Sequence, residues 1–365
     1  MKKKLFLIIL IIIAVVAVAA YLYGSYFVYG NLDTVFEMEL ANVSDCSCLP
    51  YGEGFVRCTR DGAYAIGFDG ERIWNVTYDM KNPIADCSGM CAAIADKGAD
   101  KLYICDGSET VCSVTVRPSQ ILDVETAKQG VTAVWTAEID DDYFFIYDSQ
   151  GNLLLEMKTT LEKTGFPVDM DLSEDGQRLA VAFIDILGDA MTSKVVFYNF
   201  SDVGKNYPDR VVGSVEYEDG VSRVSFMGDK LAIIRECGLS VYDYKELPTL
   251  CYDLEYEEQP KSVVNDENSI CVIYPDGQAD LRVEVYDTKK ASPRSFQARA
   301  DYTSICYSEG ELAFIGDYGC TIYRKNGQLK VKPDAQVLPK SVIRSKANRY
   351  LYLYNDKAQL VRPVF

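Results

Sequence analysis

Hydrophobic and polar residues alternate with a period of two over most of this chain. From about residue 50 onward, short runs rich in Val, Ile, Tyr and Phe are separated by turns of Gly, Asp and Asn. Side chains of a strand point alternately to its two faces, so this alternation predicts β-strands bounded by tight turns. No convincing amphipathic helix interrupts the pattern, which predicts an all-β domain.

Two short motifs recur along the domain. A strand, a tight turn and a second strand are repeated at Ser173–Val181, Met227–Ile234 and Ser308–Ile315. A strand ending in Tyr-Asp or a variant of it occurs eight times, for example at Tyr147-Asp148 and Tyr286-Asp287. The spacing is close to the ~40-residue unit of a propeller blade. The repeats therefore predict a β-propeller of about eight four-stranded blades, with seven as the alternative.

Ring closure in a propeller usually takes strands from both ends of the chain into one blade. Here residues 36–40 can pair with the last blade, which ends at Arg362. Radial stacking then buries both faces of each four-stranded sheet, which a lone sheet could not do. We therefore assign residues 36–365 to the propeller and residues 24–35 to a linker.

The N-terminus has a different pattern. Residues 5–23 contain no charged residue, Pro or Gly. At ~1.5 Å per residue, a helix of this length just spans a ~30 Å hydrocarbon core. Lys2, Lys3 and Lys4 precede it, so the positive-inside rule places residues 1–4 in the cytoplasm. The sequence thus predicts a single-pass signal anchor in a cell membrane with the propeller outside. The alternative is a signal peptide cleaved near Ala17-Val18-Ala19, which would release a secreted propeller.

Twelve cysteines follow the apolar segment. An even number in an exported protein suggests disulfides. Cys105 and Cys112 flank a hairpin turn, so they are the candidate cross-strand pair.

Composition excludes several classes of function. The sequence contains no His, which removes Ser-His-Asp and Cys-His catalysis and imidazole metal sites. A net charge of −17 argues against binding to nucleic acid, because phosphates would be repelled. No nucleophile elbow, zinc-protease motif or phosphate-binding loop is present. We therefore expect no cofactor, no metal and no catalytic residue that sequence alone can name.

The hairpins at Ser173–Val181, the Tyr-Asp turns and the N-terminal apolar segment resemble the WD-repeat-like and quinoprotein-like propeller superfamilies. The whole chain is similar to an uncharacterised bacterial family with one N-terminal membrane helix and an exported propeller. The resemblance implies a fold but no catalytic residues. The Trp-Asp dipeptide of true WD repeats is missing, and only Trp74 and Trp135 are present, so a quinone stacked on Trp is not expected.

Two sets of acidic residues are candidate sites. Glu138, Asp140, Asp141 and Asp142 form an acidic run, which could bind a hard cation such as Ca²⁺ or be a solvated hairpin end. Asp185 and Asp189 lie in a longer connection on the face that usually holds the ligand site of a propeller.

Architecture and the missing catalytic signatures favour a binding or scaffold module for a protein, a glycan or another envelope component. The alternatives are a carboxylate-based hydrolase or lyase acting on polysaccharide, and a ligand sensor that acts through a membrane partner.

Overall fold

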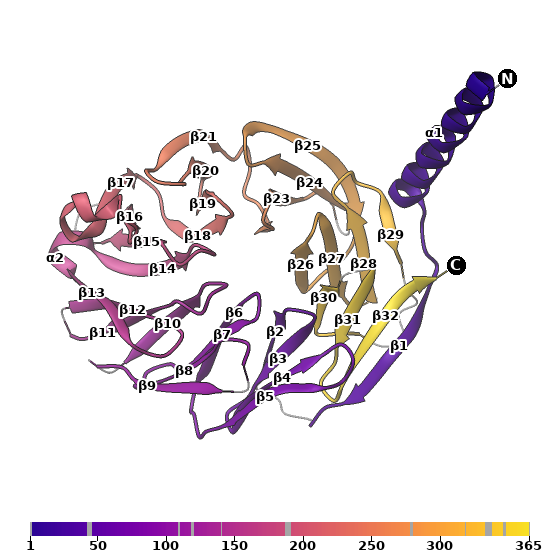
Figure 1. The fold of residues 1–365 in the computed structure, drawn as a ribbon. Helices are drawn as coiled ribbons and strands as arrows, with labels where there is room; N and C mark the ends of the chain where they lie inside the picture. Colours follow the sequence, from indigo (N-terminus) through magenta and orange to yellow (C-terminus); the bar gives the residue numbers. More distant parts are fainter. Residues whose placement is uncertain are drawn as a thin grey trace.

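The computed structural model describes residues 2–41, 46–108, 110–117, 120–139, 141–186, 191–277, 280–317, 319–332, 338–345 and 348–364. In this part of the chain, strands form eight four-stranded antiparallel sheets arranged as a ring (Figure 1). The predicted eight-bladed propeller is therefore confirmed.

Seven of the eight blades run from an innermost strand to an outermost strand in chain order, and the eighth takes its outermost strand from the N-terminal end of the chain. The first four blades are blade 1, β2 (Ser47–Tyr51), β3 (Gly54–Cys58), β4 (Gly62–Gly67) and β5 (Arg72–Thr77); blade 2, β6 (Pro83–Ser88), β7 (Cys91–Asp96), β8 (Lys101–Cys105) and β9 (Val111–Thr115); blade 3, β10 (Ile121–Thr126), β11 (Thr132–Ala137), β12 (Asp141–Tyr147) and β13 (Leu153–Thr160); and blade 4, β14 (Phe166–Leu172), β15 (Arg178–Asp185), β16 (Thr192–Asn199) and β17 (Val211–Tyr217).

The second half of the ring follows the same order. Its blades are blade 5, β18 (Val221–Met227), β19 (Lys230–Arg235), β20 (Gly238–Asp243) and β21 (Thr249–Glu255); blade 6, β22 (Ser262–Asn265), β23 (Ser269–Pro275), β24 (Asp280–Asp287) and β25 (Lys290–Arg299); blade 7, β26 (Ser304–Ser308), β27 (Glu311–Gly316), β28 (Gly319–Arg324) and β29 (Leu329–Val331); and blade 8, β30 (Ser341–Ser345), β31 (Arg349–Leu353) and β32 (Lys357–Val364) with β1 (Asn31–Glu39).

The ring is closed by the two ends of the chain. Strand β1 pairs antiparallel with β32, with Phe36 opposite Leu360 and Asp33 opposite Arg362. This confirms the predicted closure. Strand β1 begins at Asn31, however, so residues 31–35 belong to the propeller and not to the linker predicted for residues 24–35.

The core is divided into eight layers, one between each pair of neighbouring blades. The layer between blades 3 and 4, for example, contains Phe144, Met157, Leu179 and Phe183. The second strand of each blade is buried on both faces, as in β7, where Ala92, Ala93 and Ala95 have no exposed surface. Small side chains there let neighbouring sheets approach closely. These strands are therefore continuously apolar and lack the period-two alternation that marks the outer strands.

Helix α1 (Lys2–Tyr26) projects from the ring near blades 7 and 8 (Figure 1). It begins at Lys2, so Lys2–Lys4 are helical, and the cytoplasmic placement of residues 1–4 stays a prediction. Apolar side chains on it, such as Phe6 and Ile13, are exposed. Over the residues that the structure describes, no helix has the length and apolarity needed to span a membrane. The predicted membrane span is therefore not confirmed.

The predicted disulfide is not formed, because all twelve cysteines are free. Cys112 pairs with Ile104 and Cys105 with Val111 across strands β8 and β9. This register places the two thiols on opposite faces of the sheet, since successive side chains alternate. Cys105 is packed between blades 1 and 2, whereas Cys112 packs against the layer between blades 2 and 3.

Candidate functional site

A groove with a volume of about 710 Å³ lies between the outer part of blade 3 and the outer part of blade 4. We call it the side groove. One wall consists of six consecutive residues of β13, Leu155 to Thr160. Because successive side chains of a strand point to opposite faces, a groove can be lined by six in a row only if it runs along the strand edge. Strand β13 is the outermost strand of its blade, so one side of its backbone is unpaired within the sheet.

The opposite wall of the side groove is a sheet face. Lys194, Val196 and Tyr198 of β16 alternate along that strand and therefore point to the same side. Val211 and Ser214 of β17 extend this wall. An edge strand of one blade thus faces the flat surface of the next, which leaves room for an extended segment between them.

The connection between β16 and β17 forms one end of the groove. It contains two short 3₁₀ helices, η1 (Gly204–Asn206) and η2 (Pro208–Arg210). Asp209 and Arg210 both adopt positive φ angles, of 52° and 61°. Non-glycine residues in this region are uncommon and cluster at ligand-binding segments. The sequence pattern does not single out this connection, because its turn residues (Gly204, Pro208) resemble those of an ordinary loop.

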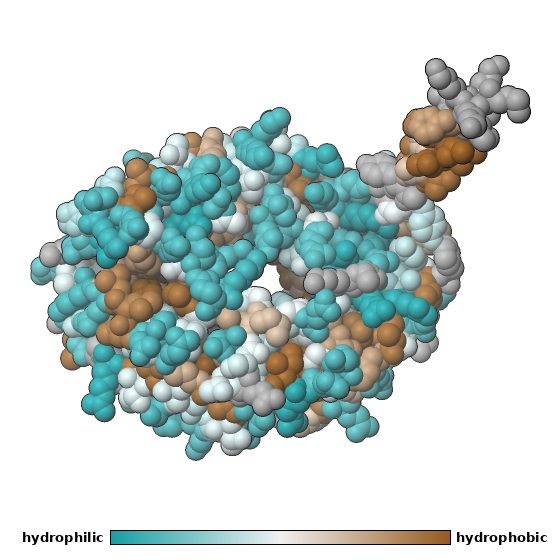
Figure 2. Space-filling view, in the orientation of Figure 1, coloured by the Kyte–Doolittle hydropathy of each residue, from teal (hydrophilic) through white to brown (hydrophobic). Residues whose placement is uncertain are grey.

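A second hollow of about 340 Å³ adjoins the groove and shares Leu155 and Arg210 with it. Apolar side chains line both hollows: Leu154 is exposed in the second hollow, and Leu155 and Val196 line the side groove. Figure 2 shows apolar side chains gathered on this side of the ring. The groove therefore combines an unpaired strand edge with apolar surface, the two features that hold extended peptides.

Both lysines of the side groove are paired with carboxylates, and Arg210, its third cation, shares the lining with Asp209 and Glu156. Lys158 Nζ lies 2.6 Å from Asp141, and Lys194 Nζ lies 3.2 Å from Glu216. These ion pairs are partly exposed, so solvent screens them and they add little to stability. The groove thus has little excess charge to offer a ligand, and its selectivity depends on shape and backbone hydrogen bonds.

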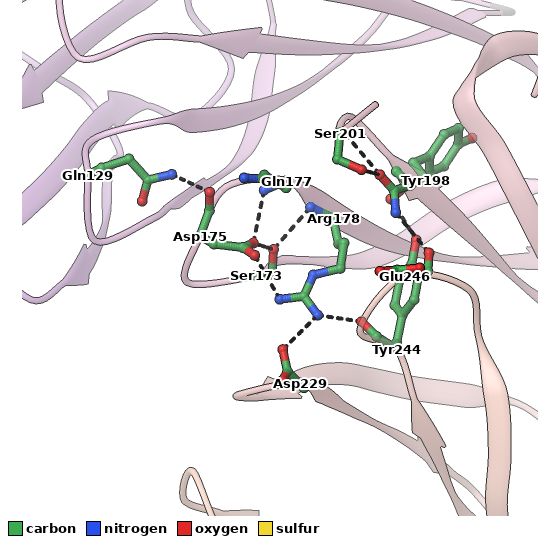
Figure 3. Close-up of polar contacts among 11 residues, drawn as sticks. Gln129, Ser173, Asp175, Gln177, Arg178, Tyr198, Ser201, Asp229, Tyr244 and Glu246 are labelled. Atoms are coloured by element: carbon green, nitrogen blue, oxygen red, sulfur yellow. Dashed lines mark hydrogen bonds and ion pairs between the residues drawn. The ribbon is translucent and has the colours of Figure 1, made fainter. Parts of the chain in front are cut away.

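A polar network centred on Arg178 joins blades 3, 4 and 5 beneath the second hollow (Figure 3). Arg178 is 4% exposed, and it donates to Asp175 at 3.0 Å, to Asp229 at 3.2 Å and to the carbonyl of Tyr244. Gln129 of blade 3 donates to the carbonyl of Asp175. The Ser173–Val181 motif recognised in the sequence therefore has a structural role, which is to fix the angle between neighbouring blades at the groove.

The central channel holds a cluster of carboxyl groups that the sequence did not point to. They are Asp86 of β6, Asp123 and Glu125 of β10, and Asp169 and Asp171 of β14, all half-buried on the innermost strands. We call these the channel carboxyls. The signal in the sequence is the i, i+2 spacing of Asp123 with Glu125 and of Asp169 with Asp171, which places each pair on one strand face. Their convergence depends on the packing of three blades.

Three of the channel carboxyls brace adjacent blades. Asp86 accepts a hydrogen bond from the N–H of Thr126 at 2.8 Å, and Asp169 accepts one from Val224 at 2.7 Å. Asp171 accepts the N–H of Phe226 at 2.5 Å. Innermost strands of neighbouring blades are not paired in a sheet, so these contacts satisfy backbone donors that would otherwise face the channel.

Burial raises the pKa of every channel carboxyl, and repulsion within the cluster adds to the effect. The pKa of Asp171 rises to about 8 and that of Asp169 to about 6, with desolvation as the main cause in both. Desolvation raises the pKa of Glu125 well above its usual range, and the charges of Asp86, Asp171, Asp123 and Asp169 raise it further. The cluster therefore holds protons near neutral pH.

Two residues of the acidic run predicted as a cation site contact other protein side chains, and the cation role stays a prediction. Asp141 binds Lys158, and Asp142 accepts a hydrogen bond from Trp135 Nε1 at 2.8 Å. Burial disfavours the charged form of Asp142 and therefore raises the pKa of its carboxyl. Glu138 lies at the same hairpin end, and Asp140 lies outside the described residues. In the described part of the chain, no group of three or more acidic or Cys side chains is arranged to hold a metal ion.

Asp185 is the last residue of β15, on the face formed by the longer connections. Its neighbour Ile184 lines a pocket on that face. Asp189 lies outside the described residues, so the predicted ligand role of this loop stays a prediction.

Comparison with known proteins agrees with the fold. The family model described as "Family of unknown function (DUF5711)" matches residues 25–362. No curated protein matches the sequence. BamB from Moraxella catarrhalis superposes with a TM-score of 0.55 at 14% identity, over 91% of this chain and 99% of that chain.

Sqt1 from Saccharomyces cerevisiae has a TM-score of 0.58 at 13% identity, covering 93% of this chain and 99% of that one. Sqt1 from Chaetomium thermophilum, bound to the N-terminus of the ribosomal protein L10, has a TM-score of 0.53 at 12% identity, covering 86% and 94%. At these identities the likeness shows the propeller fold alone.

Proposed function

The chain belongs to this family of unknown function, and from that premise we propose that it is a protein-binding scaffold whose side groove takes an extended segment of a partner protein. The segment adds as a strand to the free edge of β13, and the face of β16 and β17 covers its other side. The observation that carries the proposal is the lining of the groove by six consecutive residues of an edge strand.

The chemistry of the groove supports a polypeptide as its occupant. An unpaired edge offers a row of backbone N–H and C=O groups that only another backbone matches along its whole length. Apolar side chains such as Leu155 and Val196 provide contact area on either side of that edge. By analogy, the Chaetomium thermophilum propeller named above binds the N-terminus of a protein, although that likeness rests on fold alone.

A photocrosslinking experiment tests the proposal in cells. A crosslinking amino acid at Leu154, 57% exposed on β13, should give a discrete adduct with a partner protein. The matched control is Leu250, 51% exposed on β21 of blade 5. Equal labelling from both positions, or no adduct from Leu154, would contradict the proposal.

A blocking variant gives an independent test of the same groove. Ser214 is exposed and lines the groove, so Ser214→Trp should fill it without changing the core and reduce partner capture at least tenfold. The control is Ser113→Trp, at an exposed position on the outer strand of blade 2. Undiminished capture by the Ser214 variant would show that the partner binds elsewhere.

The hydrolase alternative takes second place. A carboxyl with a raised pKa, such as Glu125, is what a general acid requires. Three of the five channel carboxyls, however, are already occupied by backbone amides of the neighbouring strand. We therefore favour a structural role for the cluster.

The cellular location stays a prediction. The order of Lys2–Lys4 before the apolar residues 5–23 indicates export of the propeller. A phosphatase that is active only outside the cytoplasm, fused after Phe365, should be active in cells. An inactive fusion with an active cytoplasmic reporter at the same position would overturn export.

A further inference from the structure

A pocket of about 620 Å³ lies where the innermost strands of blades 5 and 6 begin, on the face formed by the longer connections. We call it the mouth pocket. Its polar lining includes Arg223, Arg235, Lys261, Ser222, Ser262 and Glu236. The volume falls in the range of about 300–1,000 Å³ that is typical of sites for small molecules. It shares no lining residue with the side groove.

Arg235 is already compensated. Its guanidinium donates to both oxygens of Asp219 at 3.1 Å and to Asp253 at 2.9 Å. The side chain is 7% exposed and lies over the Tyr217 ring at 4.8 Å. This arginine therefore forms a fixed part of the wall and has no excess charge.

Arg223 and Lys261 differ from it. Among the described residues, neither forms an ion pair with a carboxylate. Arg223 is held by two neutral acceptors, the carbonyl of Val263 at 3.1 Å and the side-chain oxygen of Asn265 at 3.0 Å, both through Nη2. Its Nε is buried without a partner in the structure as described. The two hydrogen bonds through Nη2 fix the orientation of the guanidinium, and they leave its Nη1 to bind a ligand.

The ammonium of Lys261 lies 4.0 Å from the centre of the Tyr302 ring, which holds it in place by a cation–π contact. The hydroxyl of Tyr302 donates to Ser262 Oγ at 2.9 Å, so the proton of Ser262 is left to donate elsewhere. A guanidinium, an ammonium and a hydroxyl thus line one pocket, in a protein with 54 acidic and 37 basic residues.

We propose that the mouth pocket binds a small carboxylate ligand of sugar size, such as a uronic acid, with its carboxylate between Arg223 and Lys261. Glu236 also lines the pocket, and the carboxyls of Asp169 and Asp171 act on Arg223 electrostatically, so the excess charge of the pocket is at most about one positive unit, which suits a monoanion better than a phosphate dianion. The polar groups of Ser222, Ser262 and Glu236 match the hydroxyls of a sugar ring. Charge-assisted hydrogen bonds to a desolvated arginine are among the strongest that proteins form.

The test uses the purified full chain in a mild detergent, with binding measured by calorimetry and ligand-observed NMR. Glucuronate should bind, while glucose, which has the same ring with no charge, should bind at least tenfold more weakly. Arg223→Gln and Lys261→Gln should each weaken glucuronate binding at least tenfold. Lys194→Gln, which removes a cation from the side groove, should leave it unchanged.

Three results would overturn the proposal: equal binding of glucose and glucuronate, tighter binding of inorganic phosphate than of glucuronate, or unchanged binding by the Lys261 variant. Lys261 is exposed, so its variant should fold even if Arg223→Gln does not. Because the two sites share no residue, loss of partner capture at the side groove would leave this result unaffected.

Discussion

The side groove and the mouth pocket lie on the same propeller but recognise ligands by different means. In the groove both lysines are paired with carboxylates, and the distinctive feature is an unpaired strand edge. In the pocket two of the three cations have no carboxylate partner among the described residues, and each is held by neutral groups. The side groove, whose lysines are compensated, therefore suits a polypeptide backbone. The mouth pocket, where two cations are not compensated, suits an anion.

The largest effect on stability is expected at Arg178, which holds neighbouring blades together beside the groove. Arg178→Ala removes three hydrogen bonds that join blade 4 to its own turn and to blade 5. We expect unfolding free energy to fall by about 2–4 kcal/mol, because buried charged networks are costly to break. Urea unfolding measures this, with Lys205→Ala, an exposed ion-pair residue, as the control.

The same variant sharpens the comparison. Arg178 lies beneath the second hollow, at the opposite end of β15 from Ile184, which lines the mouth pocket, so partner capture should fall while glucuronate binding is retained. A loss of both would indicate that the blades respond as one unit and that the two sites are not independent.

The next effect concerns the channel carboxyls, which line neither of the two sites. A carboxyl whose pKa is raised on folding binds its proton more tightly in the native state than in the unfolded state. Its contribution to stability is therefore greatest below the unfolded pKa of about 4 and is lost as the pH rises through the folded pKa. For Asp171 that value is about 8. Asp171→Asn should therefore match the parent at pH 4.5 and exceed its stability at pH 8.5 by on the order of 1–3 kcal/mol.

Urea unfolding at the two pH values measures the difference. Asp202→Asn is the control, because Asp202 is exposed and its pKa is lowered by Lys205. If Asp171→Asn were less stable than the parent at pH 8.5, the hydrogen bond to Phe226 would outweigh the desolvation of the charge.

A smaller effect is expected at the end of the groove. Asp209 has a φ of 52°, which glycine adopts at no steric cost. Asp209→Gly should change unfolding free energy by less than about 1 kcal/mol, because relief of strain is offset by added freedom in the unfolded chain. Partner capture should weaken, since the groove end becomes less fixed. Gly228→Ala is the reciprocal change at another turn, with a φ of 61°; among the described residues, no atom beyond its chain neighbours lies within 4 Å of the added Cβ, so its destabilisation measures the cost of the positive φ alone.

The smallest effect is expected for a lysine of the side groove, and it tests whether charge matters less in the groove than in the mouth pocket. Lys194→Gln removes a partly exposed ion pair with Glu216 and should change stability by less than about 0.5 kcal/mol. It should also leave partner capture within twofold, whereas Lys261→Gln abolishes most glucuronate binding. A large effect of Lys194→Gln on capture would show that the groove, too, selects by charge.

Sequence by itself determined the architecture, because each propeller blade is built from neighbouring residues. The hairpin at Ser173–Val181 and the Tyr-Asp turns predicted eight units, and residues 36–40 predicted the closing strand. These features are local, so periodicity and turn chemistry were sufficient. The N-terminal segment shows the limit of the same reasoning: its helix was found, but the predicted span was not confirmed.

Tertiary structure alone decided the sites. Cys105 and Cys112 flank a turn, yet a register offset of one residue turned their thiols toward different neighbouring blades. Asp86, Glu125 and Asp171 are far apart in sequence and meet because three innermost strands line one channel. Local pattern fixes which face of a strand a side chain takes, but only the stacking of blades around the ring determines which side chains of other strands it meets.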